Sequence, residues 1–542
     1  MDVALGLSEG GWRLQVQPAL WLSLLLLLLC LEACGWLRDW RRGGAGGGSA
    51  SGSRRLPGPF PWPLVGNALQ LGDSPHLTFA RMARRYGDLF QIRLGRRRVV
   101  VLNGEATIRR ALVQRGAQFA GRPDFASFRL VSGGRSLAFG RYSERWRLHR
   151  RLAQSTLRAV CGGGGEGLLE QCVSSEACRL IEAFLRLGPA GRPFEPAAEL
   201  AAAAANVMCS LCFGRRCADD DGEFRRLLGL SERFGRAVGA GSLLDVMPWL
   251  RAFPNPVRAL SRDFERLNRD FYRFVGRQVA RGRATYRPGV RRHMSDALMA
   301  AVGRCMPGEG GNAEAREAPE RLGLEPEYVE SSVNDLLGAA QDTTSAALSW
   351  ILFHLVRLPG LQSRLGQELD RVVGRERLPR ADDRSRLPSL EAFIYETLRY
   401  SSFVPLTIPH ATTAPVELDG YRLPADTVVF VNQWSVNHDR RKWAEPGAFQ
   451  PSRFLRRDGS LDRELAASVM LFSAGKRRCL GEQLSKTQLF LFTAILLHQC
   501  AFRANPAEPL SAGCTSGLTI RPRAFTLSVT LRDKRRGIVS PA

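Results

Sequence analysis

The stretch Phe472-Ser473-Ala474-Gly475-Lys476-Arg477-Arg478-Cys479-Leu480-Gly481 is the most informative part of this chain. It places a single cysteine in a loop with two glycines and three basic residues. A largely apolar run, Leu489 to Leu497, follows and predicts a helix that begins near Gly481. A thiolate at Cys479 would then lie near the helix N-terminus, where backbone N–H groups favour negative charge, and nearby arginines would lower the pKa of its thiol. Gly475 and Gly481 permit tight turns close to a bulky partner.

A cysteine taken alone is most often a small buried hydrophobe. The full string Phe-x-x-Gly-x-Arg-x-Cys-x-Gly argues against that alternative, because it resembles the haem-thiolate monooxygenases of the cytochrome P-450 superfamily. The resemblance implies the cytochrome P-450 fold, which is mainly α with a minor β-sheet region, together with an N-terminal transmembrane anchor. It also implies haem b (iron protoporphyrin IX) with the Cys479 thiolate as axial ligand and O2 as co-substrate. The other cofactor-binding residues of the motif would be Phe472, Gly475, Arg477 and Gly481.

The chain has 542 residues and a net charge of +25, nearly all of it from arginine. Such a charge suits an anionic membrane surface or an acidic protein partner. Nucleic acid is not favoured, because the arginines are scattered and no binding motif accompanies them.

The 12 cysteines have no regular spacing, which argues against a disulfide framework. Cys209-Ser210-Leu211-Cys212 has metal-like spacing with Cys217 nearby, but no second pair and no histidine accompanies it, and it lies in an apolar helical run.

The N-terminal segment has the pattern of a membrane anchor. Ala19 to Leu31 is apolar apart from Ser23, and its extension to Leu37 comes close to the ~20 residues that a span requires. Arginines follow at once, so the positive-inside rule leaves the domain after the anchor in the cytosol. A cleaved signal peptide is the alternative, but its basic start is missing. We expect an anchor at 1–42 in the endoplasmic reticulum membrane (microsomal), and the question of a mitochondrial pool stays open.

A linker is expected between this anchor and the catalytic body. Residues 43–66 begin with a flexible Gly/Ser/Ala spacer and end in a proline-rich stretch, 56–66, that resembles the hinge of microsomal members of the superfamily. Trp62 in this stretch is expected to be buried. The monooxygenase domain is expected at 67–542 as one unit, since no repeat and no central linker divides it.

The body of the chain reads as mainly helical at a period of 3.6 residues. Leu89 to Asn103 alternates around Gly95 and predicts a β-hairpin. Further short strands are expected near Val416–Leu423, Thr427–Val431, Gly517–Ile520 and Phe525–Leu531. The sum is a mainly α protein with a minor, largely N-terminal sheet.

A long helix is expected from Glu327 to Leu358. It contains Gly338-Ala339-Ala340-Gln341-Asp342-Thr343-Thr344, in which small residues would let a flat ligand approach and threonine could bond back to an i−4 carbonyl. A helix kink with solvated polar residues is the alternative. The stretch resembles the oxygen-activation motif of the superfamily, which implies that Asp342 and Thr343 relay protons to dioxygen. Ala340 stands where many members carry glycine.

Two further motifs resemble conserved elements of the superfamily around the cofactor. Glu396 and Arg399 lie at i, i+3 on one helix face, and the resemblance implies a structural network with Arg453 that sets the cysteine loop. Trp146 and Arg150 lie one helical turn apart and resemble the element that binds the haem propionates, although a basic surface helix is the alternative. Arg477 and His410 are the other propionate candidates.

From about Leu56 to Leu531 the chain is similar to family 1 of the superfamily, and most like subfamily B. Supporting runs are FASFRLVSGG at 125–134 and TVVFVNQWSVNHD at 427–439. The resemblance implies a flat, aromatic-lined substrate pocket, for which ordinary core packing is the alternative. The substrate-binding candidates are Phe128, Phe139, Phe234, Phe271, Asp335, Ala339, Leu406 and Thr519.

The implied function is a monooxygenase that hydroxylates or epoxidises planar apolar substrates. These would be polycyclic aromatic hydrocarbons, estrogens, retinoids and polyunsaturated fatty acids, with electrons from NADPH through a flavoprotein reductase. The alternative is a reductase-independent haem-thiolate isomerase or lyase that acts on lipid hydroperoxides. Such enzymes tend to lack the acid–threonine pair, so Asp342 and Thr343 favour the monooxygenase. A non-catalytic haem or lipid carrier is the third possibility.

Overall fold

The structure is a computed structural model of the 542-residue chain. It describes Ser23, residues 55–161, 166–218, 220–238, 242–290, 292–303, 325–511, 513–515, 517–533 and Ile538. The expected anchor at 1–42, apart from Ser23, and residues 43–54 of the expected linker lie outside the described residues. No helix within these described ranges combines the length and the apolar character that crossing a membrane requires.

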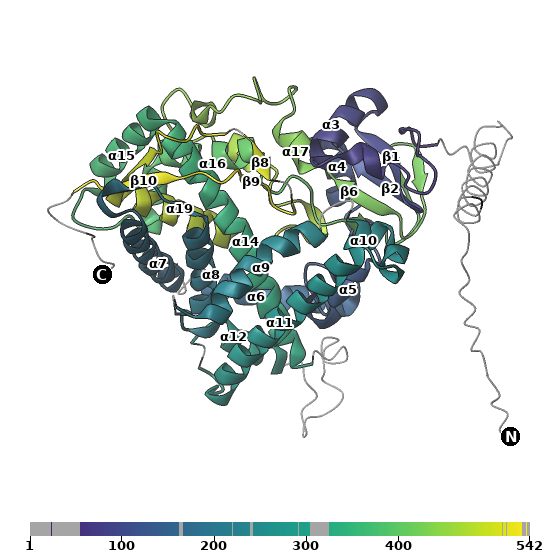
Figure 1. The fold of residues 1–542 in the computed structure, drawn as a ribbon, viewed down its shortest axis with the longest axis horizontal. Coiled ribbons are helices and arrows are strands. Elements are labelled where there is room, and N and C mark those ends of the chain that lie inside the picture. Colours follow the sequence, from purple (N-terminus) through teal and green to yellow (C-terminus); the bar gives the residue numbers. More distant parts are fainter. Residues whose placement is uncertain are drawn as a thin grey trace, which may run out of the picture.

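Helices make up most of the described chain (Figure 1). In chain order they are α2 (Ala68–Leu71), α3 (Pro75–Tyr86), α4 (Glu105–Arg109), α5 (Ala126–Leu130), α6 (Glu144–Cys161), α7 (Glu166–Leu187), α8 (Ala197–Phe213), α9 (Gly222–Val238), α10 (Leu243–Val246), α11 (Pro256–Ala284), α12 (Met294–Gly303), α14 (Glu327–Arg357), α15 (Pro359–Val373), α16 (Pro388–Ser401), α17 (Gln433–Asn437), α18 (Arg463–Ala467) and α19 (Glu482–Gln499). Local sequence explains several of their ends. Pro256 opens α11 after Asn255, whose side chain accepts hydrogen bonds from two backbone N–H groups of the first turn. Gly214 ends α8 in the left-handed conformation, at φ 69°.

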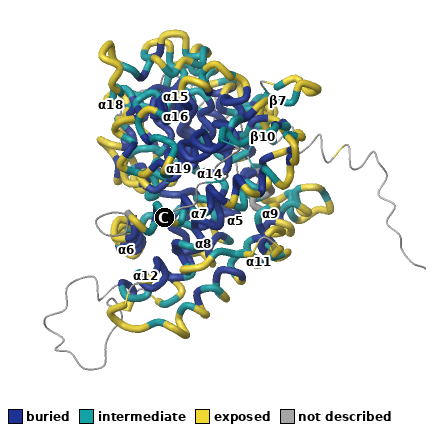
Figure 2. Tube along the Cα trace, turned by 90° about the vertical axis from the view of Figure 1, so that its left-hand side faces the viewer, coloured by how far each residue is buried: buried dark blue, intermediate teal, exposed yellow. Residues whose placement is uncertain are grey.

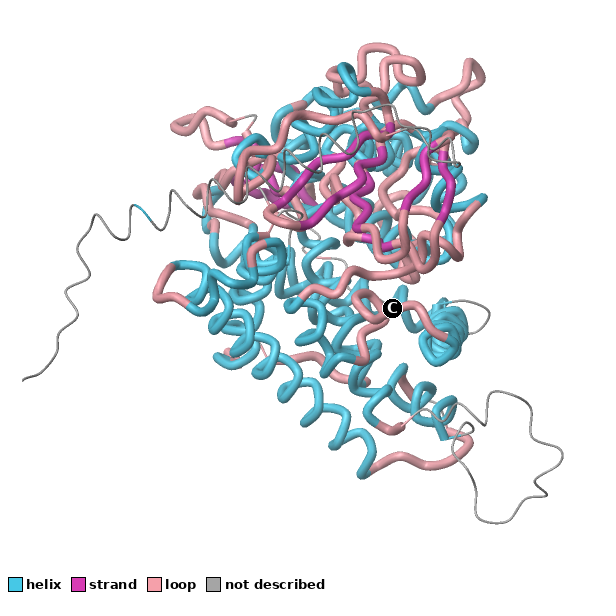
Figure 3. The backbone as a smooth tube through the Cα atoms, turned by 90° about the vertical axis from the view of Figure 1, so that its right-hand side faces the viewer, coloured by secondary structure: helices cyan, strands magenta, loops and turns pink. Residues whose placement is uncertain are grey.

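The strands form one larger sheet and several small ones. They are β1 (Leu89–Leu94), β2 (Arg97–Leu102), β3 (His410–Ala411), β4 (Val416–Leu418), β5 (Tyr421–Leu423), β6 (Val428–Val431), β7 (Cys500–Ala504), β8 (Cys514–Thr515), β9 (Arg521–Pro522) and β10 (Leu527–Leu531). The larger sheet has the order β1-β2-β6-β3, with β1 and β2 antiparallel and β6 parallel to β2. The other described pairs are β10-β7, β4-β5 and β8-β9. In Figure 3 the strands gather in one part of the molecule and helices make up most of the rest.

Most of the predicted elements are confirmed. The hairpin is β1-β2, the long helix is α14, and the helix after the cysteine loop is α19, which begins just after Gly481. The expectation of a largely N-terminal sheet is wrong, because β6 and β3 come from the second half of the chain and complete the sheet that β1 and β2 begin. The strand expected at 517–520 is also wrong: these residues form a bend, and β9 starts directly after them.

The core lies where α14, α16, α19 and α8 pack together, which Figure 2 shows as buried tube. Residues 489–497 of α19 are all buried, as expected for a helix that is apolar on every side. A hydrogen bond of 3.2 Å from the Thr344 hydroxyl to the side-chain oxygen of Gln488 joins α14 to α19. The packing therefore places α14, which carries Asp342 and Thr343, against α19, which begins directly after the cysteine loop.

The proline-rich stretch lies against the larger sheet, but not as expected. The N–H of Gly66 donates to the carbonyl of Trp62, and the N–H of Gly95 at the hairpin turn donates to the carbonyl of Val65. Trp62 is 57% exposed and Phe60 is 55% exposed. The expectation that Trp62 is buried is therefore wrong: the side chains of Leu56 and Val65 pack against apolar clusters that include hairpin residues, whereas the Trp62 ring stays exposed.

Candidate active site

The cysteine loop is fixed by its own backbone. Residues Gly475–Arg477 form a 3-10 turn, and the N–H of Cys479 donates to the carbonyl of Phe472 at 2.9 Å. Gly475 has φ +69°, and a Cβ there would lie 1.7 Å from the carbonyl oxygen of Leu112. Only glycine fits this position, and its close neighbour is the chain at Leu112. At Gly481 a Cβ would meet nothing within 4 Å, so that side of the loop is open.

Cys479 is exposed, as are its neighbours Lys476 and Arg478 on the loop. Protein around it raises its pKa by desolvation, although the N–H of Gly481 and the charges of Arg150 and Arg478 act in the opposite direction. The arginines and the helix N-terminus therefore act on the thiol in the expected direction, while desolvation opposes them. A coordinated metal ion removes the thiol proton outright, so the loop supplies a ligand that becomes anionic when iron binds.

Three arginines gather beside this loop without a carboxylate. Arg477 is buried and its guanidinium donates to the carbonyls of Ala120, Leu137 and Gly140, at distances of 2.8, 3.2 and 2.7 Å. Arg150 donates to the carbonyl of Arg478. Within the described ranges no ion pair joins Arg122, Arg150 or Arg477 to an acidic side chain. We call these three residues the cation cluster.

The cation cluster carries more positive charge than the protein around it can balance. Desolvation lowers the pKa of Arg477 well below its usual range, and the charges of Arg122 and Arg150 lower it further. The same two causes, burial and then the charge of Arg150, lower the pKa of Arg122 to about 9. Trp146 lies between two members of the cluster, with the Arg477 guanidinium 3.7 Å and that of Arg150 5.5 Å from its ring centroid. Its indole N–H donates to the carbonyl of Leu137 at 3.0 Å, which fixes the ring.

Arg122 is a site residue that the sequence did not reveal. It is 6% exposed and donates to the carbonyls of Ala138, Ile408 and Pro409 at 2.8, 3.0 and 3.0 Å. It belongs to no periodic pattern and is distant in sequence from the other motifs. The sequence marks Arg122 only as a charged residue that stands between Gly121 and Pro123.

His410 is close to this cluster but contributes no charge. Burial lowers its pKa well below the usual range, and the charge of Arg122 lowers it further. Its Nδ1 lies 2.8 Å from the carbonyl of Phe119 and must donate to it. The neutral ring then has only an acceptor left at Nε2, so the donors for an anionic ligand come from the arginines.

The central helix α14 positions the predicted acid–threonine pair. The Thr343 hydroxyl donates to the carbonyl of Ala339 at 2.8 Å, as the i−4 pattern predicted. The Asp342 carboxylate accepts from the Thr519 hydroxyl at 2.8 Å and from the Arg521 guanidinium at 2.8 Å. Ala339 is exposed although it lies midway along a packed helix. Arg521 was missed by the sequence analysis, and no motif marks it.

The predicted substrate-binding phenylalanines form a connected row. Ring centroids are 4.8 Å apart for Phe128 and Phe139, 6.2 Å for Phe139 and Phe234, and 5.3 Å for Phe234 and Phe264. Phe264, on α11, extends the row and was not predicted. Phe271, also on α11, faces Gly338 of α14, since a Cβ on that glycine would lie 3.7 Å from its ring.

The other substrate-binding candidates are more varied in their surroundings. Leu406 packs in the same apolar cluster as the row of phenylalanines. Asp335 accepts hydrogen bonds from the hydroxyls of Ser132 and Ser136 and from the N–H groups of Leu137 and Ala138. Its carboxylate thus joins the segment after α5 to α14. Burial raises the pKa of this carboxyl group. Thr519 donates to Asp342 and so belongs with the acid–threonine pair.

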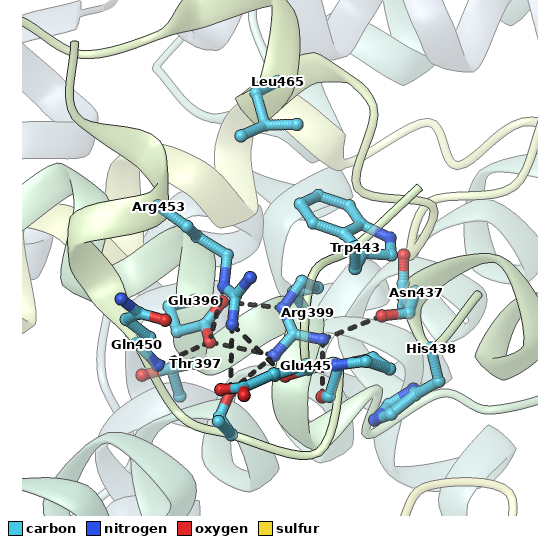
Figure 4. Close-up of polar contacts among 12 residues, drawn as sticks. Glu396, Thr397, Arg399, Asn437, His438, Trp443, Glu445, Gln450, Arg453 and Leu465 are labelled. Atoms are coloured by element: carbon cyan, nitrogen blue, oxygen red, sulfur yellow. Dashed lines mark hydrogen bonds and ion pairs between the residues drawn. The ribbon is translucent and has the colours of Figure 1, made fainter. Parts of the chain in front are cut away.

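A second buried group of charges is complete in itself (Figure 4). Arg399 binds the Glu396 carboxylate with two N–H groups at 2.7 and 2.8 Å, and Arg453 adds a third contact at 3.1 Å. The N–H of Gln450 also donates to Glu396, at 2.7 Å. The remaining guanidinium N–H groups reach carbonyls, among them those of Asn437 at 2.8 Å and Ala444 at 2.8 Å. We call Glu396, Arg399 and Arg453 the closed network.

The comparisons with known proteins agree with this arrangement. The family model described as "Cytochrome P450" matches residues 56–529. The chain belongs to the cytochrome P450 family. It is 52% identical to cytochrome P450 1B1 of Homo sapiens over 480 residues, which are 88% of this chain and 87% of the human protein. It is 52% identical to the Rattus norvegicus protein of the same name over 483 residues, 89% of this chain and 88% of that protein. With cytochrome P450 1A1 of Chelon auratus the identity is 42% over 487 residues, 88% of this chain and 91% of that one. This P450 therefore belongs to family 1, subfamily B, and is a haem-thiolate monooxygenase.

The residues of this P450 fit the haem that the family implies. Two exposed positions on packed elements, Ala339 and Cys479, leave room for a ligand. The cation cluster lacks the anions that its buried charges require, and haem carries two propionates. A soft sulfur ligand and unbalanced cations beside it are the donor set for a haem-thiolate centre. The zinc alternative at Cys209, Cys212 and Cys217 has no support, since no group of metal-ligating side chains occurs among the residues that the structure describes.

Proposed function

We propose that this P450 hydroxylates or epoxidises planar apolar molecules, with electrons supplied from NADPH by a flavoprotein reductase. The substrate class proposed comprises polycyclic aromatic hydrocarbons, estrogens, retinoids and polyunsaturated fatty acids. The observation that carries the proposal is the row of phenylalanine rings together with Phe271, which faces Gly338 of α14, the helix that bears Asp342 and Thr343. Rings that pack face-to-edge favour flat, apolar ligands over compact or charged ones.

The cofactor proposed is haem b, with Cys479 as its axial ligand and the cation cluster on its propionates. Bound there, haem supplies the activation of O2 and the transfer of oxygen to the substrate. The protein holds the sulfur in place through the Cys479–Phe472 backbone hydrogen bond. The closed network supports the segment that precedes the cysteine loop, because Gln450 and Arg453 lie in this segment and both donate to the Glu396 carboxylate.

Asp342 and Thr343 are proposed to deliver protons on the substrate side. The Thr343 hydroxyl donates to the Ala339 carbonyl, so its oxygen keeps lone pairs that can accept a proton while its own proton is passed on. Asp342 is held by Arg521 and Thr519 at the adjacent position of the helix. A carboxylate that moves away from Arg521 can carry a proton from solvent to the threonine. The two residues thus form a short relay within one helical turn.

Two surfaces support the proposed partners. Lys476 and Arg478 are exposed on the cysteine loop, which suits docking of an acidic reductase domain. Exposed aromatic pairs, Phe60 with Trp62 and Trp249 with Phe253, suit contact with a phospholipid membrane. The hairpin turn lies between them, since Gly95 bonds to Val65 and approaches the Val246 carbonyl. We propose on this basis a microsomal enzyme at the endoplasmic reticulum membrane, with its anchor at 1–42 and its catalytic domain in the cytosol.

The test is the yield of product for each NADPH consumed, in a reconstituted system with reductase. Thr343→Ala is expected to lower this coupling about 10-fold or more, since a positioned proton donor contributes about 10²–10⁴-fold. Ser349→Ala is the matched control on the same helix, because its hydroxyl makes the same i−4 bond, to Ser345 at 2.8 Å. Product formation that persists without reductase, from a lipid hydroperoxide, would favour the isomerase or lyase alternative.

A further inference from the structure

Two cysteines outside the active site lie in contact. The sulfur atoms of Cys209, on α8, and Cys217, just beyond α8, are 3.7 Å apart. Both are free thiols in the structure. Cys209 is fully buried, whereas Cys217 is partly exposed. A molecule from solvent can therefore reach Cys217, and only Cys217 can reach Cys209 from there.

The chain that carries Cys217 is held in this position by several contacts. Gly214 ends α8 with a left-handed residue, which turns the chain back along the helix. The N–H of Cys217 donates to the side-chain oxygen of Asn206 at 2.8 Å. Arg216 donates to Glu176 of the neighbouring helix α7 at 2.9 Å. The contact between the two sulfur atoms thus depends on a turn that several hydrogen bonds hold in place.

The two thiols differ in their chemistry. The hydrogen bond between the two thiols lowers the pKa of Cys217, and the charges of Arg215 and Arg216 lower it further. The same hydrogen bond, followed by burial, raises the pKa of Cys209. Cys217 is then the nucleophile and Cys209 the thiol that resolves it. Cys212, also buried on α8, is the other thiol near this site, and its part is tested below by substitution.

We propose that Cys217 and Cys209 form a reversible oxidation site that a hydroperoxide converts to a disulfide. The Cys217 thiolate attacks one oxygen of hydrogen peroxide; an S–O bond forms, the O–O bond breaks, and hydroxide leaves and takes up a proton as water. The Cys209 sulfur then attacks the Cys217 sulfenic acid; the S–S bond forms, the S–O bond breaks, and a second water leaves with the Cys209 proton. Two thiols are oxidised and one peroxide is reduced to two waters.

The distance between the two sulfur atoms requires only a small movement of the chain before a disulfide can form. A disulfide needs its sulfurs about 2 Å apart, so the pair must approach by about 1.7 Å. Cys217 can supply that movement because it lies outside the helix, while Cys209 stays in place within α8. Closure of the bond also protects Cys217 from irreversible oxidation to a sulfinic acid.

Peptide mapping of the full-length haem-bound enzyme tests the proposal. The protein is treated with a small molar excess of hydrogen peroxide, free thiols are alkylated, and trypsin cleaves without reductant. Because Arg215 and Arg216 lie between the two cysteines, Cys209 falls in peptide 187–215 and Cys217 in peptide 217–225. We expect a cross-linked pair of these peptides, which dithiothreitol separates.

Two variants identify the partner. Cys212→Ala is the matched control and should keep the cross-linked pair at the wild-type level, whereas Cys209→Ala should abolish it. A cross-link that survives in Cys209→Ala but is lost in Cys212→Ala would overturn the assignment. So would a wild-type protein in which Cys217 is recovered only as thiol or as sulfinic acid.

Discussion

The molecule contains two groups of arginines, largely buried, that differ in one respect: Arg122 and Arg477 of the cation cluster are buried and Arg150 is half-buried. In the closed network, Arg399 and Arg453 share the carboxylate of Glu396 at 2.7 to 3.1 Å, and all three side chains are at most 9% exposed. In the cation cluster, the described contacts of Arg122, Arg150 and Arg477 are with carbonyl groups and the Trp146 ring, and none of the described ion pairs joins them to a carboxylate. The positive charges of the closed network are balanced by a carboxylate of the protein, and those of the cation cluster are not.

The difference separates a structural role from a binding role. A buried charge is tolerated when it is paired, and leaving it without a partner costs several kcal/mol. The closed network meets this condition without any ligand, so it can hold the chain before the cysteine loop in every state of the enzyme. We expect the cation cluster to meet it when an anionic group, such as a haem propionate, binds beside it. The comparison therefore predicts opposite responses to removal of a charge at the two places.

The largest effect is expected from Glu396→Gln, which removes the anion of the closed network. Two buried guanidinium groups then lose their counter-charge, at a cost of about 3–5 kcal/mol in the free energy of unfolding. Denaturant unfolding followed by circular dichroism measures the loss. Glu105→Gln is the control, since Glu105 pairs with Arg109 and Lys442 at the surface and should cost about 0–1 kcal/mol. Equal losses in the two variants would show that the network is not needed for stability.

The next effect is expected from Arg150→Met in the cation cluster. The protein without haem should keep its stability or gain slightly, because repulsion among the three arginines is relieved. Haem affinity should fall by about 10- to 100-fold, which corresponds to the loss of a hydrogen bond of about 1.5–3 kcal/mol to a charged group. Transfer of haem to an excess of a scavenging globin measures this. Arg145 is exposed on the same helix, so Arg145→Met should change neither quantity. If Arg150→Met lowered the stability of the haem-free protein and Arg145→Met did not, the cation cluster would not differ from the closed network in the way described.

The smallest effect concerns acid sensitivity beside the closed network. His354 is fully buried and stacked on Phe449, with ring centroids 3.9 Å apart, and neither of its ring nitrogens has a hydrogen-bond partner among the residues that the structure describes. Burial lowers its pKa from 6.5 to about 3. The unfolded chain therefore binds the extra proton first, so the stability from the neutral ring is complete above pH 6.5 and is lost as the pH falls towards 3.

The variant His354→Phe should lack this part of the pH dependence. Between pH 7 and pH 5 the wild type should lose about 2 kcal/mol more than the variant, at about 1.36 kcal/mol for each pH unit below 6.5. Free energies of unfolding at the two pH values measure the difference, and the other buried histidines cancel because both proteins keep them. Identical losses would show that His354 is protonated in the folded protein.

How much of this could be predicted from sequence depends on whether a local pattern carried the information. The cysteine loop, the hairpin and α14 were predicted because a motif or a period marks each within a short stretch. Glu396 and Arg399 form a motif of four residues, and the distant Arg453 entered only through the family resemblance. Arg122 and Arg521 escaped, because each acts through partners far away in the chain and neither belongs to a pattern.

What the sequence did not reveal has a common physical origin. Asp335 was a pocket candidate from the family resemblance alone, and nothing in the sequence indicates the four hydrogen bonds that its carboxylate accepts from the segment after α5. The pKa of Cys479 was expected to be low from its arginines, but desolvation outweighs them. Trp62 was expected inside because it is apolar, but only its backbone packs. In each case tertiary surroundings decided the outcome.

The central claim is that Cys479 and the cation cluster together bind haem as a thiolate complex. The most direct measurement is the absorption spectrum of the purified, reduced protein under carbon monoxide. The account predicts the long-wavelength Soret band of a thiolate-ligated haem. A band of the imidazole-ligated type, or a protein that retains no porphyrin, would contradict it.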